Sequence, residues 1–290
     1  MSIVYLNGEY LPLAEAKVSV LDRGFTFGDG VYEVIPVFSG NILRLEEHLD
    51  RLYDSLAGID INFPLSRPEI KEILLEVVKR NPAQGDQQIY MQVTRGVTDR
   101  EHFYEGLITP TFFVMCKPIV AKDLSSGVKA ITHDDIRWKY CHIKAIALLP
   151  NVLLKKLARG RENCHEAILI RDGIVTEGVA SNVFVVIGDK IRTPPKNNNV
   201  LPGITRDLVV ELLKAAGFNC TETDITEAEL KAADEIWISS STMGLAPVIN
   251  LDGKDVKDGR PGPVWKQAHE LYESYKLNGP HVIRDKDVVA

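Results

Sequence analysis

One lysine in the chain has surroundings that suggest chemistry. The stretch "CHIKAIALLPNVLLKKLA" (141–158) places Lys144 among apolar residues, with no acidic neighbour in sequence. A lysine deprived of water by burial has a lowered pKa, so it can supply the neutral amine that forms an imine with a carbonyl group. The simpler alternative is a stem packed on the core with its charged head in water. Taken alone, the lysine favours this alternative, and a carbonyl cofactor needs support from other residues.

Two further stretches contain groups that bind anions. In "LPGITRD" (201–207) an extended run ends, and a helix is predicted to begin near Thr205. The backbone N–H groups of Ile204 and Thr205 would then point out of the helix N-terminus, where a phosphate binds well. The stretch "SSSTMG" (239–244) offers hydroxyl and N–H groups at the end of a strand. Each could equally be an ordinary helix start or a polar turn, so each is weak evidence alone.

Two charged residues stand at the edges of apolar patterns. Arg51 in "EEHLDRL" flanks the apolar stripe of a predicted helix, where it could form a structural salt bridge or pair with a phosphate. Glu177 in "IVTEGVASNVF" follows an apolar strand and precedes small residues. A carboxylate there could keep a pyridine nitrogen protonated, which makes the ring an electron sink. The alternative is a strand-end glutamate in water.

A glycine-rich stretch and a basic loop complete the candidates. "DRGFTFGDGVYEV" (22–34) lacks GxGxxG spacing and a following helix, so it does not support a dinucleotide-binding fold. Its glycines allow the backbone to pass close to a ligand, with Tyr32 aimed into the space. Arg100 and His102 lie in "VTRGVTDREHF". Such a loop is often only solvated, but it could bind an acid.

The composition excludes several classes of protein. The 290 residues are 45% hydrophobic and 26% charged, which is typical of a globular protein with room for two modest domains. The net charge of -6 provides no basic surface for nucleic acid or an anionic membrane. Neither a signal peptide nor a run of about 20 apolar residues is found, so no membrane span is expected. Four cysteines without C-x-x-C spacing predict reduced thiols in a cytoplasmic protein and no metal site.

Strands dominate the predicted secondary structure. Hairpin turns are predicted at Asn7-Gly8, Asp172-Gly173 and Gly188-Asp189. Apolar spacing and capping residues predict helices over about 45–56, from Ser66 in "SRPE", over about 205–216 and 226–233, and in "PVWKQAHELYESYK". Strands grouped with a few helices, without strict βαβ alternation, predict an α+β fold in two parts. The polar stretch "AKDLSSGVK" (121–129) is the expected interdomain linker.

Together these motifs resemble those of the fold-type IV pyridoxal-phosphate enzymes, and most closely those of the D-amino acid aminotransferases. "DRGFTFGDGVYEV", "EHLDRLY", "QVTRG…REH", "DIRW…IK", "EAIL…VTEG…SNVF", "GITRD" and "STMGLAPVI" occur in the family's order. The resemblance runs from about Ile3 to Lys276. It implies a small N-terminal α/β domain over 1–120, a larger barrel-like domain that binds the cofactor over 130–277, and a tail over 278–290. The cofactor would lie between the two domains.

The same resemblance assigns roles to individual residues. Lys144 would form the internal Schiff base with pyridoxal 5'-phosphate, and Glu177 would face the pyridine nitrogen. Arg51 would bind the phosphate. The remaining cofactor-binding residues would be Ser181, Ile204, Thr205 and Ser241.

Substrate binding separates the branches of this family. The D-amino acid branch resembles this sequence in Tyr32 and in the Arg-x-His pair at Arg100 and His102, which would bind the substrate carboxylate. In that branch the pair comes from the second subunit, which implies a homodimer with active sites at the interface. The expected reaction is transamination between a D-amino acid, such as D-alanine, and 2-oxoglutarate or pyruvate. The alternatives are a branched-chain L-aminotransferase, an aminodeoxychorismate lyase, or a catalytically silent protein on the same fold.

Overall fold

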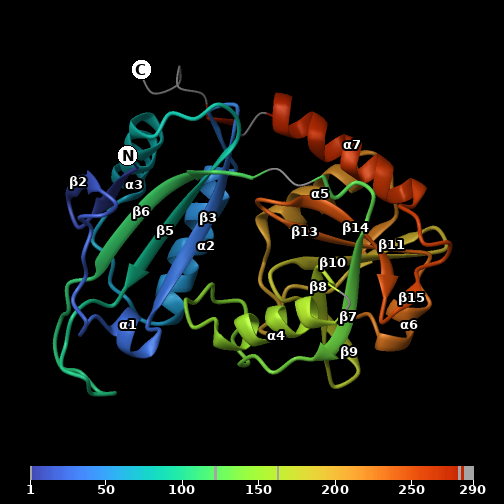
Figure 1. The fold of residues 1–290 in the computed structure, drawn as a ribbon, viewed down its shortest axis with the longest axis horizontal. Helices are drawn as coiled ribbons and strands as arrows, with labels where there is room; N and C mark the ends of the chain where they lie inside the picture. Colours follow the sequence, from blue (N-terminus) through green and yellow to red (C-terminus); the bar gives the residue numbers. More distant parts are fainter. Residues whose placement is uncertain (1, 121–122, 162, 280–281, 284–290) are drawn as a thin grey trace. The chain divides into compact units, whose positions relative to one another are not determined.

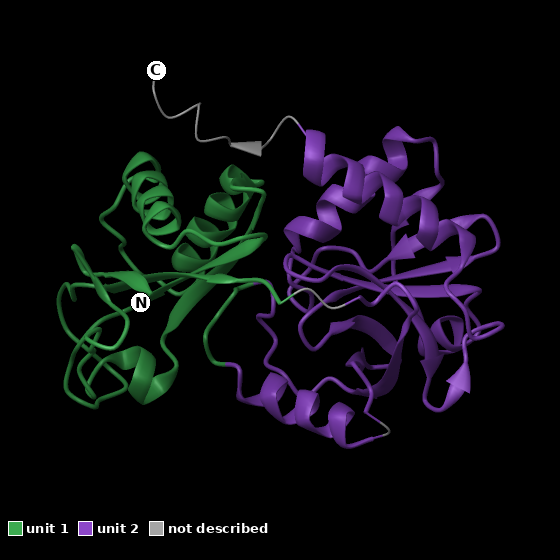
Figure 2. Cartoon of the chain, turned by 45° about the horizontal axis from the view of Figure 1, so that its top comes forward, with its two compact units in different colours: residues 1–120, 143–147, 280–290 green, residues 121–142, 148–279 purple. Residues whose placement is uncertain are grey.

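The computed structural model describes residues 2–120, 123–161, 163–279 and 282–283. The chain forms two compact units (Figure 2). Of the described residues, unit 1 contains 2–120, 143–147 and the strand at 282–283, and unit 2 contains 123–142, 148–161 and 163–279. Residues 121–122 of the expected linker (121–129) lie outside the described residues, and its last two residues, Val128 and Lys129, form the start of the strand β7. Residues 143–147 join unit 1, although the chain on either side of them belongs to unit 2.

Unit 1 is a sheet with helices packed on it (Figure 1). The sheet order is β16-β4-β3-β5-β6-β1-β2, and neighbouring strands are antiparallel. The strands are β1 (Ile3–Leu6), β2 (Glu9–Pro12), β3 (Gly30–Phe38), β4 (Asn41–Leu43), β5 (Gln87–Thr94), β6 (Thr111–Pro118) and β16 (Val282–Ile283). The helices are α1 (Arg23–Phe27), α2 (Leu45–Gly58) and α3 (Arg67–Arg80).

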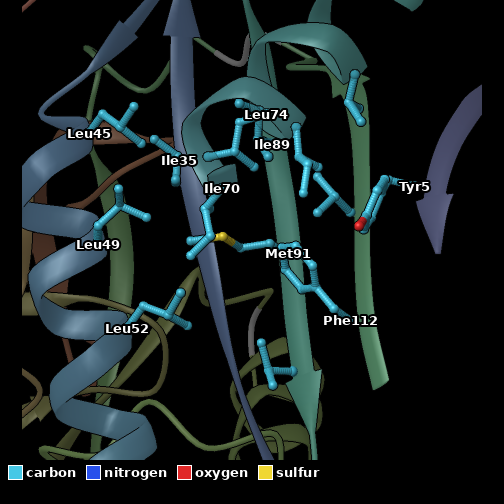
Figure 3. Packing of buried hydrophobic residues seen from close by; sticks show 14 of the residues in the cluster. Tyr5, Ile35, Leu45, Leu49, Leu52, Ile70, Leu74, Ile89, Met91 and Phe112 are labelled. Atoms are coloured by element: carbon cyan, nitrogen blue, oxygen red, sulfur yellow. The ribbon is translucent and has the colours of Figure 1, made fainter. Parts of the chain in front are cut away.

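The core of unit 1 explains why α2 forms where the spacing predicts it. Leu45, Leu49, Leu52 and Leu56 are all buried and belong to one cluster with apolar residues of the sheet and of α3. Figure 3 shows the first three of these leucines facing the sheet. Burying each leucine side chain contributes about 1.5–3 kcal/mol to the stability of the folded state. The apolar stripe therefore determines which face of the helix packs against the sheet. The short helix α1 is not predicted by spacing, because five residues hold too few apolar positions to show a period.

Unit 2 is built around a mixed sheet. Its order is β12-β11-β10-β13-β14-β7-β8-β9, with β15 added to β14. The strands are β7 (Val128–Asp134), β8 (Glu166–Arg171), β9 (Ile174–Gly178), β10 (Asn182–Ile187), β11 (Lys190–Thr193), β12 (Cys220–Glu222), β13 (Glu235–Ser240), β14 (Gly244–Leu251) and β15 (Lys254–Asp255). The sheet curls back on itself, because the chain passes from β9, at one end of this order, to β10, third from the other end, through residues 179–181 alone. At this turn the Gly178 N–H donates to the Ser181 carbonyl over 2.7 Å.

Four helices complete unit 2 among its described residues: α4 (Leu149–Gly160), α5 (Ile204–Ala215), α6 (Glu227–Lys231) and α7 (Pro263–Asn278). The capping box predicted at α6 is present, since Glu229 N–H donates to Thr226 Oγ1 over 3.2 Å and Thr226 N–H donates to Glu229 Oε2 over 2.9 Å. The α+β prediction is confirmed.

The four cysteines, Cys116, Cys141, Cys164 and Cys220, are buried free thiols. Burial raises the pKa of Cys116 and of Cys220 to about 11. None of the helices in the described part of the chain has the length and apolar character that a membrane crossing requires.

Candidate active site

Lys144 lies in a short segment that pairs with β3. The Tyr32 N–H donates to the Lys144 carbonyl over 3.0 Å. Two residues further along each of the two segments, the Ile146 N–H donates to the Gly30 carbonyl over 3.0 Å. These bonds attach residues 143–147 to unit 1, although the chain on either side belongs to unit 2.

The Lys144 side chain stands against an aromatic ring. Nζ lies 4.3 Å from the centroid of the Tyr32 ring, a distance at which an ammonium is attracted to the ring face. The Tyr32 ring stacks in turn on Tyr90, with centroids 5.8 Å apart. The backbone N–H of Lys144 donates to Ser55 Oγ of α2 over 3.1 Å. Lys144 is half-buried, and none of the described carboxylates forms an ion pair with its amine.

A buried carboxylate on β3 holds two basic side chains of α2. Glu33 Oε1 accepts from Arg51 Nε over 2.7 Å, and Glu33 Oε2 accepts from Arg51 Nη2 over 2.8 Å. His48 Nδ1 lies 2.8 Å from the same Oε2. Burial acts to raise the pKa of Glu33, but Arg51 and these hydrogen bonds outweigh it and hold that pKa well below its usual range. Burial lowers the pKa of His48, and the nearby charges of Arg51 and Lys144 add to this effect.

Arg51 therefore takes part in the structural salt bridge that the sequence left open as one possibility. Its contact with a phosphate stays a prediction. Sequence analysis missed Glu33, although a signal was available. Strand alternation places Glu33 on the same face of β3 as Val31 and Ile35, both fully buried, so its carboxylate had to find a partner inside the unit.

Glu177 is buried in unit 2, which rules out a strand-end glutamate in water. Its Oε1 accepts from Arg137 Nη1. Its Oε2 accepts from Asn182 Nδ2 over 3.2 Å and from the Leu201 N–H over 3.1 Å. Burial raises the pKa of Glu177 to about 7, against the opposing effects of Arg137 and of the Leu201 hydrogen bond. The carboxyl group thus exchanges a proton near neutral pH.

Arg137 is shared between two carboxylates. Its Nε donates to Asp135 Oδ1 over 2.9 Å, and its Nη2 donates to Asp135 Oδ2 over 2.8 Å. Burial acts to raise the pKa of Asp135, but the Arg137 hydrogen bond outweighs it and lowers that pKa. The negative charge of Asp135 also contributes to the raised pKa of Glu177. Arg137 belongs to the "DIRW" motif, but no role could be read for it from sequence.

The N-terminus of α5 belongs to the same hydrogen-bonded cluster as Glu177. Its N-cap is Gly203, which has no side chain to occupy the first N–H groups. Asn182 connects the two features, because its Nδ2 also donates to the Leu201 carbonyl over 2.9 Å. The predicted phosphate-binding residues at this helix start, Ile204 and Thr205, are buried. Their contact with a phosphate stays a prediction.

Two predicted cofactor-binding serines lie elsewhere in unit 2. Ser181 Oγ donates to Glu166 Oε2 over 2.9 Å, and Lys155 Nζ lies 3.2 Å from Oε1 of the same buried carboxylate. Ser241 is half-buried in the turn between β13 and β14. The Ser181 hydroxyl thus has a partner within the protein, and a cofactor contact remains a prediction for both serines.

Arg100 and His102 lie in an exposed loop of unit 1 and share one aromatic contact. The Arg100 guanidinium carbon lies 5.4 Å from the centroid of the Phe27 ring, and the His102 ring centroid lies 5.4 Å from the same point. Among the described residues, both side chains contact Phe27 and neither contacts the Tyr32 ring. The structure therefore brings the pair together at the surface, and its substrate role stays a prediction.

These groups can perform a limited set of reactions. An amine held against an aromatic ring can attack a carbonyl or transfer a proton. A carboxyl group with a pKa of about 7 can keep a basic ring nitrogen protonated. A helix N-terminus that begins at glycine can bind phosphate. An acyl transferase or a dehydrogenase would need a different set of groups.

Comparison with known proteins identifies the family. The protein family described as Amino-transferase class IV matches residues 30–251 of this chain. A D-alanine aminotransferase of Bacillus licheniformis is 43% identical over 277 residues, which cover 95% of this chain and 97% of that protein. The chain belongs to the class IV aminotransferases.

Solved structures agree with this family at the level of the fold. A branched-chain aminotransferase of Thermoproteus uzoniensis is 27% identical with a TM-score of 0.88, covering 97% of this chain and 98% of that chain. A hypothetical aminotransferase of Mycobacterium tuberculosis, in a PLP-bound form, is 26% identical with a TM-score of 0.83, covering 95% and 99%. The predicted fold-type IV architecture is confirmed.

The close approach of Gly203 to Asn182 gives a first prediction. A Cβ added at Gly203 would overlap Asn182 Oδ1, and Asn182 is fixed by its bonds to Glu177 and Leu201. Gly203→Ala should lower the free energy of unfolding by about 1–3 kcal/mol, as overpacking does. Urea denaturation measures this, with Gly160→Ala as control, because a Cβ there meets open space. Equal stability of the two variants would contradict the described packing.

The raised pKa of Glu177 gives a second prediction, for the protein without cofactor. The ordinary pKa of 4.5 applies to the unfolded chain and about 7 to the folded one, so the stabilising contribution is complete below pH 4.5 and is lost as pH rises through 7. The loss amounts to about 3 kcal/mol. The stability of the wild type relative to Glu177→Gln should therefore fall between pH 5 and 8, as measured by urea denaturation. Exposed Glu270 supplies the control, Glu270→Gln. A pH-independent difference would show that Glu177 stays ionised throughout.

Proposed function

We propose that this class IV aminotransferase uses pyridoxal 5'-phosphate to transfer an amino group between a D-amino acid, such as D-alanine, and a 2-oxo acid, such as 2-oxoglutarate or pyruvate. The observation that carries the proposal is Lys144, an amine fixed by β3 against the Tyr32 ring and not neutralised by a described carboxylate. The D-alanine aminotransferase similar to this chain over nearly its whole length supports the substrate class.

The residues present fit the cofactor. Lys144 would bind its aldehyde carbon, and Glu177, whose pKa of about 7 suits a shared proton, would hold the ring nitrogen. The phosphate would lie at the α5 N-terminus, where Gly203 leaves the N–H groups of Ile204 and Thr205 uncovered by a capping side chain. Arg51, Ser181 and Ser241 would complete the set of contacts. Bound pyridoxal phosphate supplies an electron sink for the charge that develops at the substrate Cα.

The side chains of this chain would then perform the remaining tasks. Lys144 Nζ removes the proton from the substrate Cα, and its position is fixed through the backbone by Tyr32 and Ser55. Arg137 keeps the Glu177 carboxyl oriented through its Nη1 contact. Glu33 keeps the Arg51 guanidinium in one orientation through two hydrogen bonds. Positioning of this kind needs no rearrangement at the moment of reaction.

Stereochemistry follows from where the substrate carboxylate is bound. Lys144 can remove the Cα proton only from the face that it reaches, so the two enantiomers must exchange the positions of carboxylate and side chain. A carboxylate site on one side therefore selects one enantiomer. We assign that site to Arg100, His102 and the Tyr32 hydroxyl, because an arginine pairs bidentately with a carboxylate.

The assembly and the compartment are part of the same proposal. The Arg100–His102 pair lies in an exposed loop that carries exposed Phe103 and Leu107, 76% and 91% accessible. Apolar side chains so exposed suit burial by a second copy of the chain. We propose a homodimer in which this loop binds the carboxylate at the partner's active site. Four free thiols support a cytoplasmic location.

The role of Lys144 is tested by substitution. Lys144→Ala should fold, bind pyridoxal phosphate only non-covalently and lose nearly all turnover, because its amine both attaches the cofactor and moves the proton. Borohydride reduction of the wild type followed by peptide mapping should place the pyridoxyl label on Lys144. Lys156→Ala is the control, because Lys156 is exposed, and it should keep the label on Lys144. A label on another lysine would contradict the assignment.

The substrate class is tested with racemic alanine and 2-oxoglutarate. Chiral chromatography should show D-alanine consumed and L-alanine retained. Arg100→Ala should raise the Michaelis constant for D-alanine by about ten- to a hundred-fold, since a charge-assisted hydrogen bond contributes about 1.5–3 kcal/mol. A preference for L-leucine or L-valine would instead identify a branched-chain L-aminotransferase, and the role of Lys144 would stand unchanged.

A further inference from the structure

A buried arginine lies beneath the loop that carries Arg100 and His102. Arg23, the first residue of α1, is 5% exposed. Its Nη1 donates to the Glu101 carbonyl over 2.6 Å, and its Nη2 donates to the His102 carbonyl over 3.3 Å. The guanidinium thus binds the carbonyl oxygens of the two peptide groups on either side of the His102 Cα.

Further contacts of Arg23 extend along the same loop, which we call the carboxylate loop and define as residues 97–104. Nη1 also lies 3.4 Å from Thr98 Oγ1. The Arg23 guanidinium carbon lies 5.1 Å from the centroid of the Tyr104 ring. It also lies 4.7 Å from the centroid of the Phe27 ring, the ring that Arg100 and His102 contact. Within the described structure, the carboxylate loop contains no helix and only an isolated bridge at Val97, so these contacts replace a regular hydrogen-bond ladder.

A second arginine connects Arg23 to α2. Asp29 Oδ2 accepts from Arg23 Nε over 2.9 Å and from Arg95 Nε over 2.8 Å. Arg95 in turn donates to the carbonyls of Ile59 and Asp60, over 2.6 and 2.8 Å, just beyond the end of α2. Burial acts to raise the pKa of Asp29, but its hydrogen bonds to the two arginines lower it, so the bridging group stays charged. The carboxylate loop is thereby connected to the helix that carries His48 and Arg51.

We propose that Arg23 is a positioning residue for substrate recognition: oriented by Asp29, it sets the backbone at Glu101 and His102 and so presents Arg100 and His102 to the substrate carboxylate. This inference rests on the proposed function. Arg23 itself needs no contact with the substrate. A guanidinium suits the task because its planar fork can bind two carbonyls and a carboxylate at once, whereas an ammonium acts as a point charge.

The proposal predicts a split between kinetic constants. Arg23→Ala should raise the Michaelis constants for D-alanine and 2-oxoglutarate about tenfold or more, with a smaller change in kcat and no change in cofactor attached to Lys144. Arg23→Lys keeps the positive charge and should show a smaller increase in the Michaelis constants than Arg23→Ala. It replaces the alanine variant in the test if that variant fails to fold. Arg192→Ala is the control, because Arg192 forms its salt bridge with Glu229 in unit 2.

A double-mutant cycle separates positioning from general destabilisation. On an Arg100→Ala/His102→Ala background, Arg23→Ala should change the Michaelis constants less than about threefold, because both side chains that it positions have already been removed. An undiminished effect on that background would overturn the proposal, and so would unchanged Michaelis constants in Arg23→Ala itself.

Limited proteolysis provides a readout that does not depend on turnover. Trypsin cleavage after Arg100, which is exposed in the single chain and lies at the proposed subunit interface, should be faster in Arg23→Ala than in the wild type when both have the same oligomeric state, because the loop backbone loses two hydrogen bonds. Equal cleavage rates would contradict the positioning role. If the wild type does not consume D-alanine, the proposed function fails, while the proteolysis comparison still decides whether Arg23 holds the loop.

Discussion

The backbone hydrogen bond from Tyr32 to Lys144 is the constraint that fixes the candidate catalytic lysine on the sheet of unit 1. Since residues 143–147 lie far from β3 in sequence, their pairing fixes the lysine relative to a strand that already carries the aromatic ring and the buried carboxylate. Tyr32 and Glu33 are adjacent, so strand alternation sends them to opposite faces. One face presents the ring to the lysine amine, and the other presents the carboxylate to Arg51 of α2.

Glu33 and Glu177 show that burial beside an arginine does not determine the charge of a carboxyl group. Both are buried and both contact an arginine, yet the pKa of Glu33 is lowered and that of Glu177 is raised to about 7. The difference lies in how the cation is shared. Glu33 receives two hydrogen bonds from Arg51 and a contact from His48, whereas Glu177 shares Arg137 with Asp135, whose own charge opposes a second anion.

Sequence predicted what is local. Leucine spacing predicted α2, and a capping box predicted the start of α6. The Asn7-Gly8 pair predicted the first hairpin turn, and both residues have positive φ in the structure. It also singled out Lys144 and Glu177 one at a time. It did not predict that residues 143–147 leave unit 2 to pair with β3, or that Arg137 serves two carboxylates. The pairing with β3 and the contact of Arg137 with Glu177 join residues far apart in the chain, which neither periodicity nor spacing encodes.

The buried network of Glu33, His48 and Arg51 constrains how this protein can change. Replacing Glu33 or Arg51 alone leaves an uncompensated charge inside unit 1, which costs about 3–5 kcal/mol, comparable to much of the stability of a typical domain. Viable variants would have to replace the members together, which makes these positions poor targets for altering specificity. The exposed side chains of the carboxylate loop carry no such penalty. Substrate range can therefore diverge there while the lysine and its supporting strand remain unaltered.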